Sequence, residues 1–216
     1  KEFFISKSKL LIKSSLFSYF IILKVKCSLI SHKTSYSELK FIIKTFCLII
    51  FSKPMIIHVK NKNTLIIDDF RFKCCVGKNG LNSNKIEGDY STPKGLFKLE
   101  KLYFRKDRVG VPQCKIAKKI IKKNIAWCDD PKHKKYNSEI LKINKKNKEN
   151  FYRKDHIYDY LITISHNSKK IPYKGSAIFI HITNSYKPTA GCIALKKKDF
   201  EILLKLINQK TKIKID

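Results

Sequence analysis

A histidine and a cysteine lie eleven residues apart in the last third of the chain. His181 ends an apolar run and Cys192 opens the next one, and polar and turn-forming residues separate the two runs. A strand, a loop and a second strand would bring the two side chains together. An imidazole beside a thiol can take its proton, which a cysteine needs because its thiol is mostly protonated at neutral pH. The spacing alone also fits two ordinary core residues.

The residues before Cys192 suit acyl transfer. Gly191 would let a reacting carbonyl group approach the backbone closely. The backbone N–H groups of Gly191 and Cys192 could receive the developing oxyanion, and Thr189 could supply a further hydroxyl to the substrate. His181 would act first as a base and then as an acid. These residues form the candidate catalytic site.

The elements around this site are expected to be mainly strands. Short β-branched and aromatic runs predict strands over 55–59, 64–67, 70–76, 96–104, 158–165, 176–183 and 211–215. Residues 77–95 read as a long loop, and 110–150 as irregular. Apolar residues at helical spacing predict one amphipathic helix over 197–208, after the proposed nucleophile. The class is therefore a mainly β domain with few helices.

The composition argues against the partner that its charge suggests. The 47 basic and 17 acidic residues give a net charge of +30, which is typical of proteins that bind nucleic acid. However, only four of the 47 are arginines, and the lysines are spread along the chain. Arginine is the preferred fork for phosphates and base edges, so we expect no nucleic-acid partner. The non-enzymatic alternative is a basic module that binds nucleic acid or another anion. It predicts DNA binding that weakens with salt and is unchanged when Cys192 is replaced.

The cysteines do not indicate a metal site. The seven cysteines include no Cys-x-x-Cys pair and no His/Cys metal spacing. We therefore predict no metal and no disulfide framework.

A domain boundary is expected at the only methionine, Met55. Residues 1–54 contain ten Lys and two Glu but no Gly, Arg, Asp or Trp. We interpret them as a non-native upstream extension, or alternatively as a weak signal or anchor, and 55–216 as the catalytic domain. The apolar run 16–23 resembles the core of a signal peptide but is too short for a membrane-spanning helix, so no stable span is expected.

Several ordered motifs resemble one enzyme family. Thr189-Ala-Gly191-Cys192-Ile193, with His181 upstream, resembles the active-site signature of the L,D-transpeptidase (YkuD-like) family. Thr92-Pro-Lys-Gly-Leu-Phe97 resembles a turn found earlier in the same domain. Further segments resemble a compact proteobacterial branch of the family: 77–80, 87–89, 127–131, 136–137 and 175–179.

The resemblance implies a β-sandwich-like catalytic domain that works without a metal or cofactor. It implies that Cys192 attacks the bond between the diamino acid and the terminal D-Ala of a peptidoglycan stem peptide, and that an amine or water then resolves the thioester. The alternatives are an L,D-carboxypeptidase or another cysteine hydrolase. Such a substrate predicts the cell envelope or periplasm, whereas a start at Met55 would predict the cytoplasm.

Two positions depart from the family pattern. Many members have Gly directly after the His and Arg two places after the Cys, but Ile182 and Ala194 stand there in this chain. Since the substrate ends in a carboxylate, a different arginine could hold it. The candidates are Arg105, Arg108 and Arg153, and we predict that at least one of them binds this carboxylate. The alternative is that they form structural ion pairs with acids such as Asp107 or Asp155.

Overall fold

The computed structural model describes residues 55–141 and 148–216. The chain divides into two units, Lys1–Lys53 and Pro54–Asp216. The upstream extension or weak signal predicted for 1–54 lies outside the described residues and stays a prediction. Among the residues described, no helix is long and apolar enough to cross a membrane.

The main sheet of the described domain confirms the mainly β class. Its order is β11 (Tyr160–Ile164), β12 (Phe179–Ile182), β13 (Ile193–Leu195), β3 (Phe70–Cys75), β2 (Thr64–Ile67), β1 (Ile56–Lys60), β14 (Lys212–Ile215), β6 (Gly95–Phe104) and β7 (Ala117–Ile120). Each strand predicted from the β-branched runs is present, shifted by at most three residues at an end.

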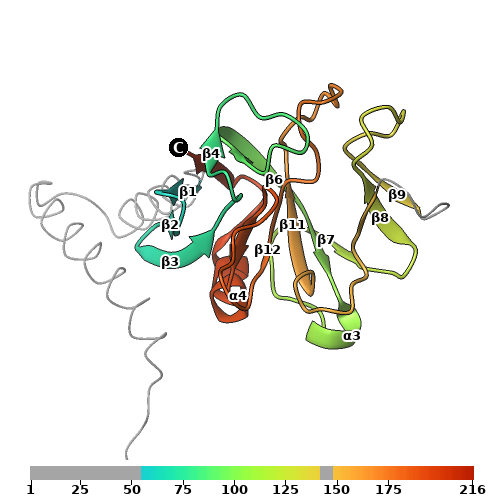
Figure 1. The fold of residues 1–216 in the computed structure, drawn as a ribbon. Coiled ribbons are helices and arrows are strands. Elements are labelled where there is room, and N and C mark those ends of the chain that lie inside the picture. Colours follow the sequence, from blue (N-terminus) through green and yellow to red (C-terminus); the bar gives the residue numbers. More distant parts are fainter. Residues whose placement is uncertain (1–54, 142–147) are drawn as a thin grey trace, which may run out of the picture. The chain divides into compact units, whose positions relative to one another are not determined.

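The long strand β6 turns this sheet into a sandwich-like layer pair. Its first residues pair with β14, from Gly95 opposite Ile215 to Lys98 opposite Lys212. Its later residues pair with both β7 and β11, so that Phe104 lies opposite Tyr160. One strand therefore belongs to both halves, and its pairing with β11 links the first strand of the order to the next-to-last one (Figure 1).

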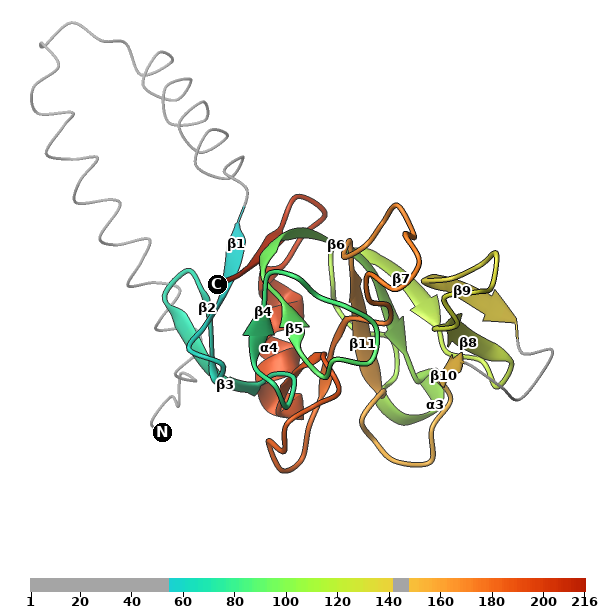
Figure 2. The same cartoon turned by 45° about the horizontal axis from the view of Figure 1, so that its top comes forward.

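The segment 110–150, predicted to be irregular, is more ordered than its composition indicates. It contains β7 of the main sheet and a separate three-stranded sheet in the order β10 (Lys148–Asn150), β8 (Ile125–Cys128) and β9 (Ser138–Leu141). In both views this small sheet stands at the opposite end of the domain from β1 to β3 (Figures 1 and 2). The loop 77–95 likewise contains a two-stranded parallel pair, β4 (Leu81–Asn82) and β5 (Thr92–Pro93).

Two apolar clusters lie on opposite faces of β12 and β13. The larger includes Ile180 and Ile193 together with Phe200, Leu203 and Leu204 of helix α4 (Lys197–Leu206), which follows β13 as predicted. The one other described helix, α3 (Lys106–Val109), is a single turn. All residues of β11, β12 and β13 are buried, because both faces of these strands are covered.

Candidate active site

The sheet register places His181 and Cys192 on the same face. β12 and β13 are adjacent and parallel, with Ile180 opposite Ile193 and His181 opposite Ala194. Successive side chains on a strand point to opposite faces. Since Ile180 and Ile193 pack on the helix side, His181 and Cys192 point to the other side, one diagonal step apart. The predicted strand, loop and strand therefore bring the pair together.

The face that carries Cys192 is lined with aromatic rings. Its buried cluster consists of Cys192 with Tyr103, Ile121, Ile125, Phe151, Tyr158, Leu161 and Phe179. Trp127 of β8 closes the cluster from the small sheet, with its ring 5.4 Å from that of Phe179 and nearly perpendicular to it. The nucleophile candidate thus lies in an apolar environment between the two sheets.

The Cys192 thiol is almost covered. Its residue is 8% exposed. The Phe179 N–H donates to Sγ at 3.4 Å, and the thiol donates to the Ala177 carbonyl at 3.3 Å. Burial raises the pKa of Cys192 to about 12, because desolvation penalises the thiolate. In this arrangement the thiol is protonated and its hydrogen is directed at Ala177.

The His181 ring is prepared to accept a proton. Its Nδ1 lies 2.8 Å from the Ile182 carbonyl, which can only accept, so Nδ1 donates and Nε2 is left unprotonated. The Tyr158 ring packs edge-on against the imidazole at 5.3 Å. Burial lowers the pKa of His181 to about 4, so the ring is neutral at neutral pH.

The resting pair differs from the ion pair that proximity suggests. Both His181 and Cys192 are buried among apolar groups, and desolvation shifts the two pKa values apart toward their neutral forms. The thiol hydrogen is directed at the Ala177 carbonyl, and both groups are held in their neutral forms.

The turn before the thiol uses the Thr189 hydroxyl internally. The Gly191 N–H donates to Thr189 Oγ1 at 3.1 Å, and this hydroxyl donates to the Cys192 carbonyl at 2.6 Å. Of the two backbone donors predicted for an oxyanion, Gly191 is thus engaged within the turn. The described residues offer no acceptor to the Cys192 N–H. The substrate-binding role of Thr189 stays a prediction, since the structure gives its hydroxyl a turn-forming one.

Gly191 itself occupies a position that no other residue fits. Its φ is +152°, and an added Cβ would lie 2.9 Å from the Ser91 carbonyl oxygen. Its carbonyl accepts a 2.7 Å hydrogen bond from the Thr92 hydroxyl. The Thr92 turn, which sequence motifs only associated with the same family, therefore contacts the nucleophile segment directly.

Asp89 holds the loop that carries Thr92. Burial alone would raise the pKa of its carboxyl, but hydrogen bonds from Lys85 and Ser91 outweigh this and hold the pKa well below its usual range. Both the N–H and the hydroxyl of Ser91 donate to it, at 2.9 and 2.6 Å. The segment before Thr92 is fixed by an ionised side chain.

The three predicted arginines are bound to acids or carbonyls. Arg105 is 3% exposed and makes a bidentate pair with Asp107, with distances of 2.8 and 2.6 Å. Arg153 makes a similar pair with Asp155, at 2.9 and 2.7 Å. Arg108 binds Asp159 at 2.9 Å and two backbone carbonyls.

Arg153 is linked to His181 through one aromatic ring. Its guanidinium lies 5.1 Å above the Tyr158 ring, which contacts His181. The family arginine position cannot contribute, because Ala194 is fully buried in β13 between His181 and Cys75. The carboxylate clamp stays a prediction, with Arg153 as its best-placed candidate.

Asn137 makes four hydrogen bonds near the site, although the sequence marks it only as part of the 136–137 motif. Its Oδ1 accepts from the Trp127 indole at 2.9 Å and from the Ala177 N–H at 3.2 Å. Its amide donates to the carbonyls of His166 and Asn167 at 3.0 and 3.1 Å. One side chain thus ties the small sheet to the loop whose carbonyl receives the Cys192 thiol. A lone Asn among many gives no sequence signal for this role.

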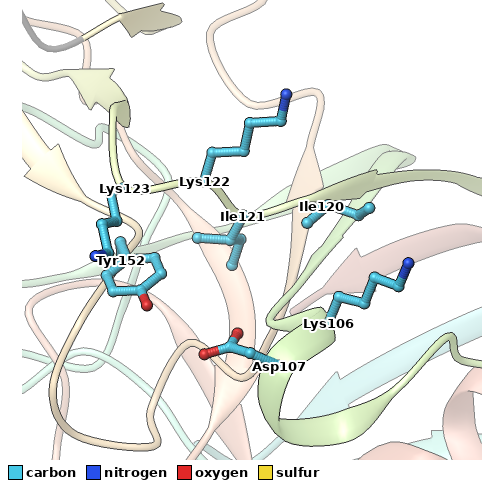
Figure 3. Close-up of a pocket in the computed structure, with 7 residues that line it drawn as sticks. All are labelled: Lys106, Asp107, Ile120, Ile121, Lys122, Lys123 and Tyr152. Atoms are coloured by element: carbon cyan, nitrogen blue, oxygen red, sulfur yellow. The ribbon is translucent and has the colours of Figure 1, made fainter.

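The described domain has a surface pocket of about 530 Å³ that is not lined by Cys192 or His181. It is lined by Lys106, Asp107, Ile120, Ile121, Lys122, Lys123 and Tyr152 (Figure 3). It shares Ile121 with the buried Cys192 cluster, and its Tyr152 packs against that cluster. In a chain with a net charge of +30, three lysines around a hollow specify no particular ligand.

Fold and site together define a sandwich-like β domain with a thiol and an imidazole on adjacent parallel strands. The family model of the YkuD L,D-transpeptidase catalytic domain matches residues 52–215, and the chain belongs to this family. No curated protein matches the chain significantly.

Solved structures with a similar fold include three from different bacteria. The helical cell shape determining protein Pgp2 from Campylobacter jejuni has a TM-score of 0.43 at 18% identity, over 76% of this chain and 47% of that one. Bdellovibrio bacteriovorus Bd1075 has a TM-score of 0.39 at 12% identity, over 76% and 47%. An L,D-transpeptidase from Mycobacterium smegmatis has a TM-score of 0.34 at 11% identity, over 75% and 57%. The chain spans about half the length of these proteins.

Proposed function

We propose that this protein is a peptidoglycan L,D-transpeptidase in which Cys192 is the nucleophile and His181 the general base and acid. The observation that carries the proposal is the placement of both side chains on one face of adjacent parallel strands, within a domain of this family. Membership of the family supports cysteine acyl transfer as the reaction, and the local geometry supports the assignment of the two residues. A peptidoglycan stem peptide is the donor substrate.

The first half-reaction forms a thioester. The Cys192 thiol turns from Ala177 to His181, Nε2 takes its proton, and Sγ attacks the carbonyl between the diamino acid and the terminal D-Ala. The Cys192 N–H stabilises the oxyanion, as a backbone donor does in other acyl transfers. The carbon–nitrogen bond breaks, and His181 returns the proton to the departing D-Ala amine.

The second half-reaction releases the enzyme. An amine of a neighbouring stem peptide attacks the thioester carbonyl and gives a proton to His181. The carbon–sulfur bond breaks, and the proton returns to Sγ. If water is the acceptor, the same steps yield a trimmed tripeptide, which is the carboxypeptidase alternative. A peptidoglycan substrate places the reaction in the cell envelope, which we propose as the site of action.

The test is incubation of the purified protein with a tetrapeptide stem ending in D-Ala, followed by mass spectrometry. We expect release of D-Ala, an acyl-enzyme at Cys192 and a crosslinked dimer. Cys192→Ala and His181→Gln should abolish all three. A tripeptide without dimer would assign the hydrolase alternative. Release of D-Ala that persists in Cys192→Ala would refute the assignment of the nucleophile.

A further inference from the structure

The Thr92 hydroxyl makes two hydrogen bonds that define its proton position. It accepts from the Gly77 N–H at 2.8 Å and donates to the Gly191 carbonyl at 2.7 Å. An N–H can only donate and a carbonyl can only accept, so the assignment is unique. Thr92 is fully buried, and its partner Gly191 precedes the nucleophile Cys192.

The segment that carries Thr92 fits closely between two glycines. A Cβ on Gly77 would lie 2.4 Å from the Tyr90 carbonyl oxygen, and a Cβ on Gly191 would lie 2.9 Å from the Ser91 carbonyl oxygen. The backbone before Thr92 therefore contacts both flanking segments without any intervening side chain. Such close contact leaves the hydroxyl little freedom to bind elsewhere.

This contact controls the direction of one backbone donor. In a trans peptide the C=O and the following N–H point in opposite directions, and no described peptide bond is cis. Holding the Gly191 carbonyl toward Thr92 thus holds the Cys192 N–H away from it. The Gly191 N–H is already bound by Thr189 Oγ1, so the Cys192 N–H is the backbone donor of this turn that lies beside the thiol.

We propose that Thr92 is a positioning residue that orients the Cys192 N–H toward the oxygen of the acyl group under attack. The inference rests on the proposed function, in which Cys192 accepts an acyl group. Thr92 does not touch the substrate. It fixes the 191–192 peptide before the substrate arrives, so that oxyanion stabilisation costs no reorganisation.

Two reactions of the same thiol separate this role from a structural one. Acylation of Cys192 by p-nitrophenyl acetate passes through an oxyanion, whereas alkylation by iodoacetamide does not. We expect Thr92→Val to slow acylation about tenfold or more and to leave the alkylation rate within about twofold. Thr92→Ser keeps the hydroxyl and should restore the wild-type ratio of the two rates. Peptide mapping by mass spectrometry would follow Cys192 in both reactions.

The control is Thr211, a second buried threonine far along the chain. It is 1% exposed, and its hydroxyl accepts from the Asn208 N–H at 2.9 Å. Thr211→Val should cost a similar buried hydrogen bond yet leave the ratio of acylation to alkylation unchanged. If Thr92→Val does not fold, Thr92→Ala serves instead, and the ratio should fall in the same way.

The outcomes distinguish this inference from the proposed function. Equal slowing of both reactions in Thr92→Val, or an unchanged ratio, would overturn the orienting role. Alkylation of the wild type without acylation would overturn it as well, since no oxyanion site would then exist. Because neither reagent is a stem peptide, failure on peptidoglycan with an intact Thr92 effect would reject the substrate alone.

Discussion

Cys192 directs its thiol at the Ala177 carbonyl, 3.3 Å away, and not at His181. This relationship leaves the thiol protonated and hydrogen-bonded. A buried, protonated thiol reacts slowly with small electrophiles, so we expect any reaction of Cys192 to begin with rotation of its side chain.

The first prediction concerns the reactivity of Cys192 with pH. Burial raises its pKa to about 12, so the thiolate fraction should increase about tenfold for each pH unit between pH 7 and pH 9. The rate of alkylation by iodoacetamide at Cys192 should follow this increase without a plateau, as measured by peptide mapping with Cys192→Ser as the control. A plateau at or below about pH 8 would instead indicate a stable ion pair with His181.

The second prediction concerns acid stability. Burial lowers the pKa of His181 from 6.5 to about 4, so the unfolded chain binds this proton more readily than the folded one. The stability that depends on the neutral ring is complete above pH 6.5 and is lost as the pH falls toward 4. Between pH 6.5 and pH 5 the free energy of unfolding should fall by about 1.5 kcal/mol from this group.

Urea unfolding of wild type and His181→Gln at pH 6.5 and pH 5 measures the contribution of His181 to the free energy of unfolding. The other titrating groups are common to both proteins, so this free energy should decrease by about 1.5 kcal/mol less in the variant. Identical decreases would mean that His181 titrates normally in the folded protein.

The third prediction concerns Asn137. Asn137→Ala removes four hydrogen bonds and leaves the Trp127 indole N–H without its acceptor. We expect a loss of about 2–4 kcal/mol in the free energy of unfolding. Thermal melting should show it, whereas the exposed Asn124, on the turn before β8, should tolerate Ala within about 0.5 kcal/mol. Equal melting temperatures for both variants would remove Asn137 from its bridging role.

The fourth prediction compares two arginines. Arg153→Lys should reduce kcat/KM on the stem peptide about tenfold or more, which corresponds to about 1.4 kcal/mol, with little change in melting temperature. Arg105 is 3% exposed, and its guanidinium lies 3.6 Å above the Tyr152 ring. Arg105→Lys should therefore lower the melting temperature. Full activity in Arg153→Lys, or a loss that only follows unfolding, would assign Arg153 to a structural ion pair with Asp155.

The sequence predicted the parts of the site that depend on local patterns. The buried strand that ends near His181, the turn before Cys192 and the amphipathic helix after it each leave a short-range signal. Strand β7 leaves none, because it is mostly exposed and Lys-rich, so that its strand conformation depends on pairing with β6. The composition of one segment does not predict its pairing with a strand that is distant in the sequence.

The surroundings of His181 and Cys192 could not be predicted from the sequence either. The raised pKa of Cys192 depends on rings from β6, β8 and the segment around Phe151, which no spacing near the cysteine reveals. The bond between Thr92 and Gly191 joins residues 99 positions apart. Arg105 and Arg153 show the same limit, since their type suggested a carboxylate while the fold decided which carboxylate each one binds.

The connection between β12 and β13 also has a consequence for the order of folding. Closing the short loop between His181 and Cys192 costs about 2 kcal/mol less chain entropy than closing the segment between Thr92 and Gly191. The two reactive side chains can therefore meet early, while the backbone around them is still unoriented. During refolding, the peptide between Gly191 and Cys192 should therefore be among the last parts of the site to reach its orientation, because the Thr92 bond that holds it spans 99 positions.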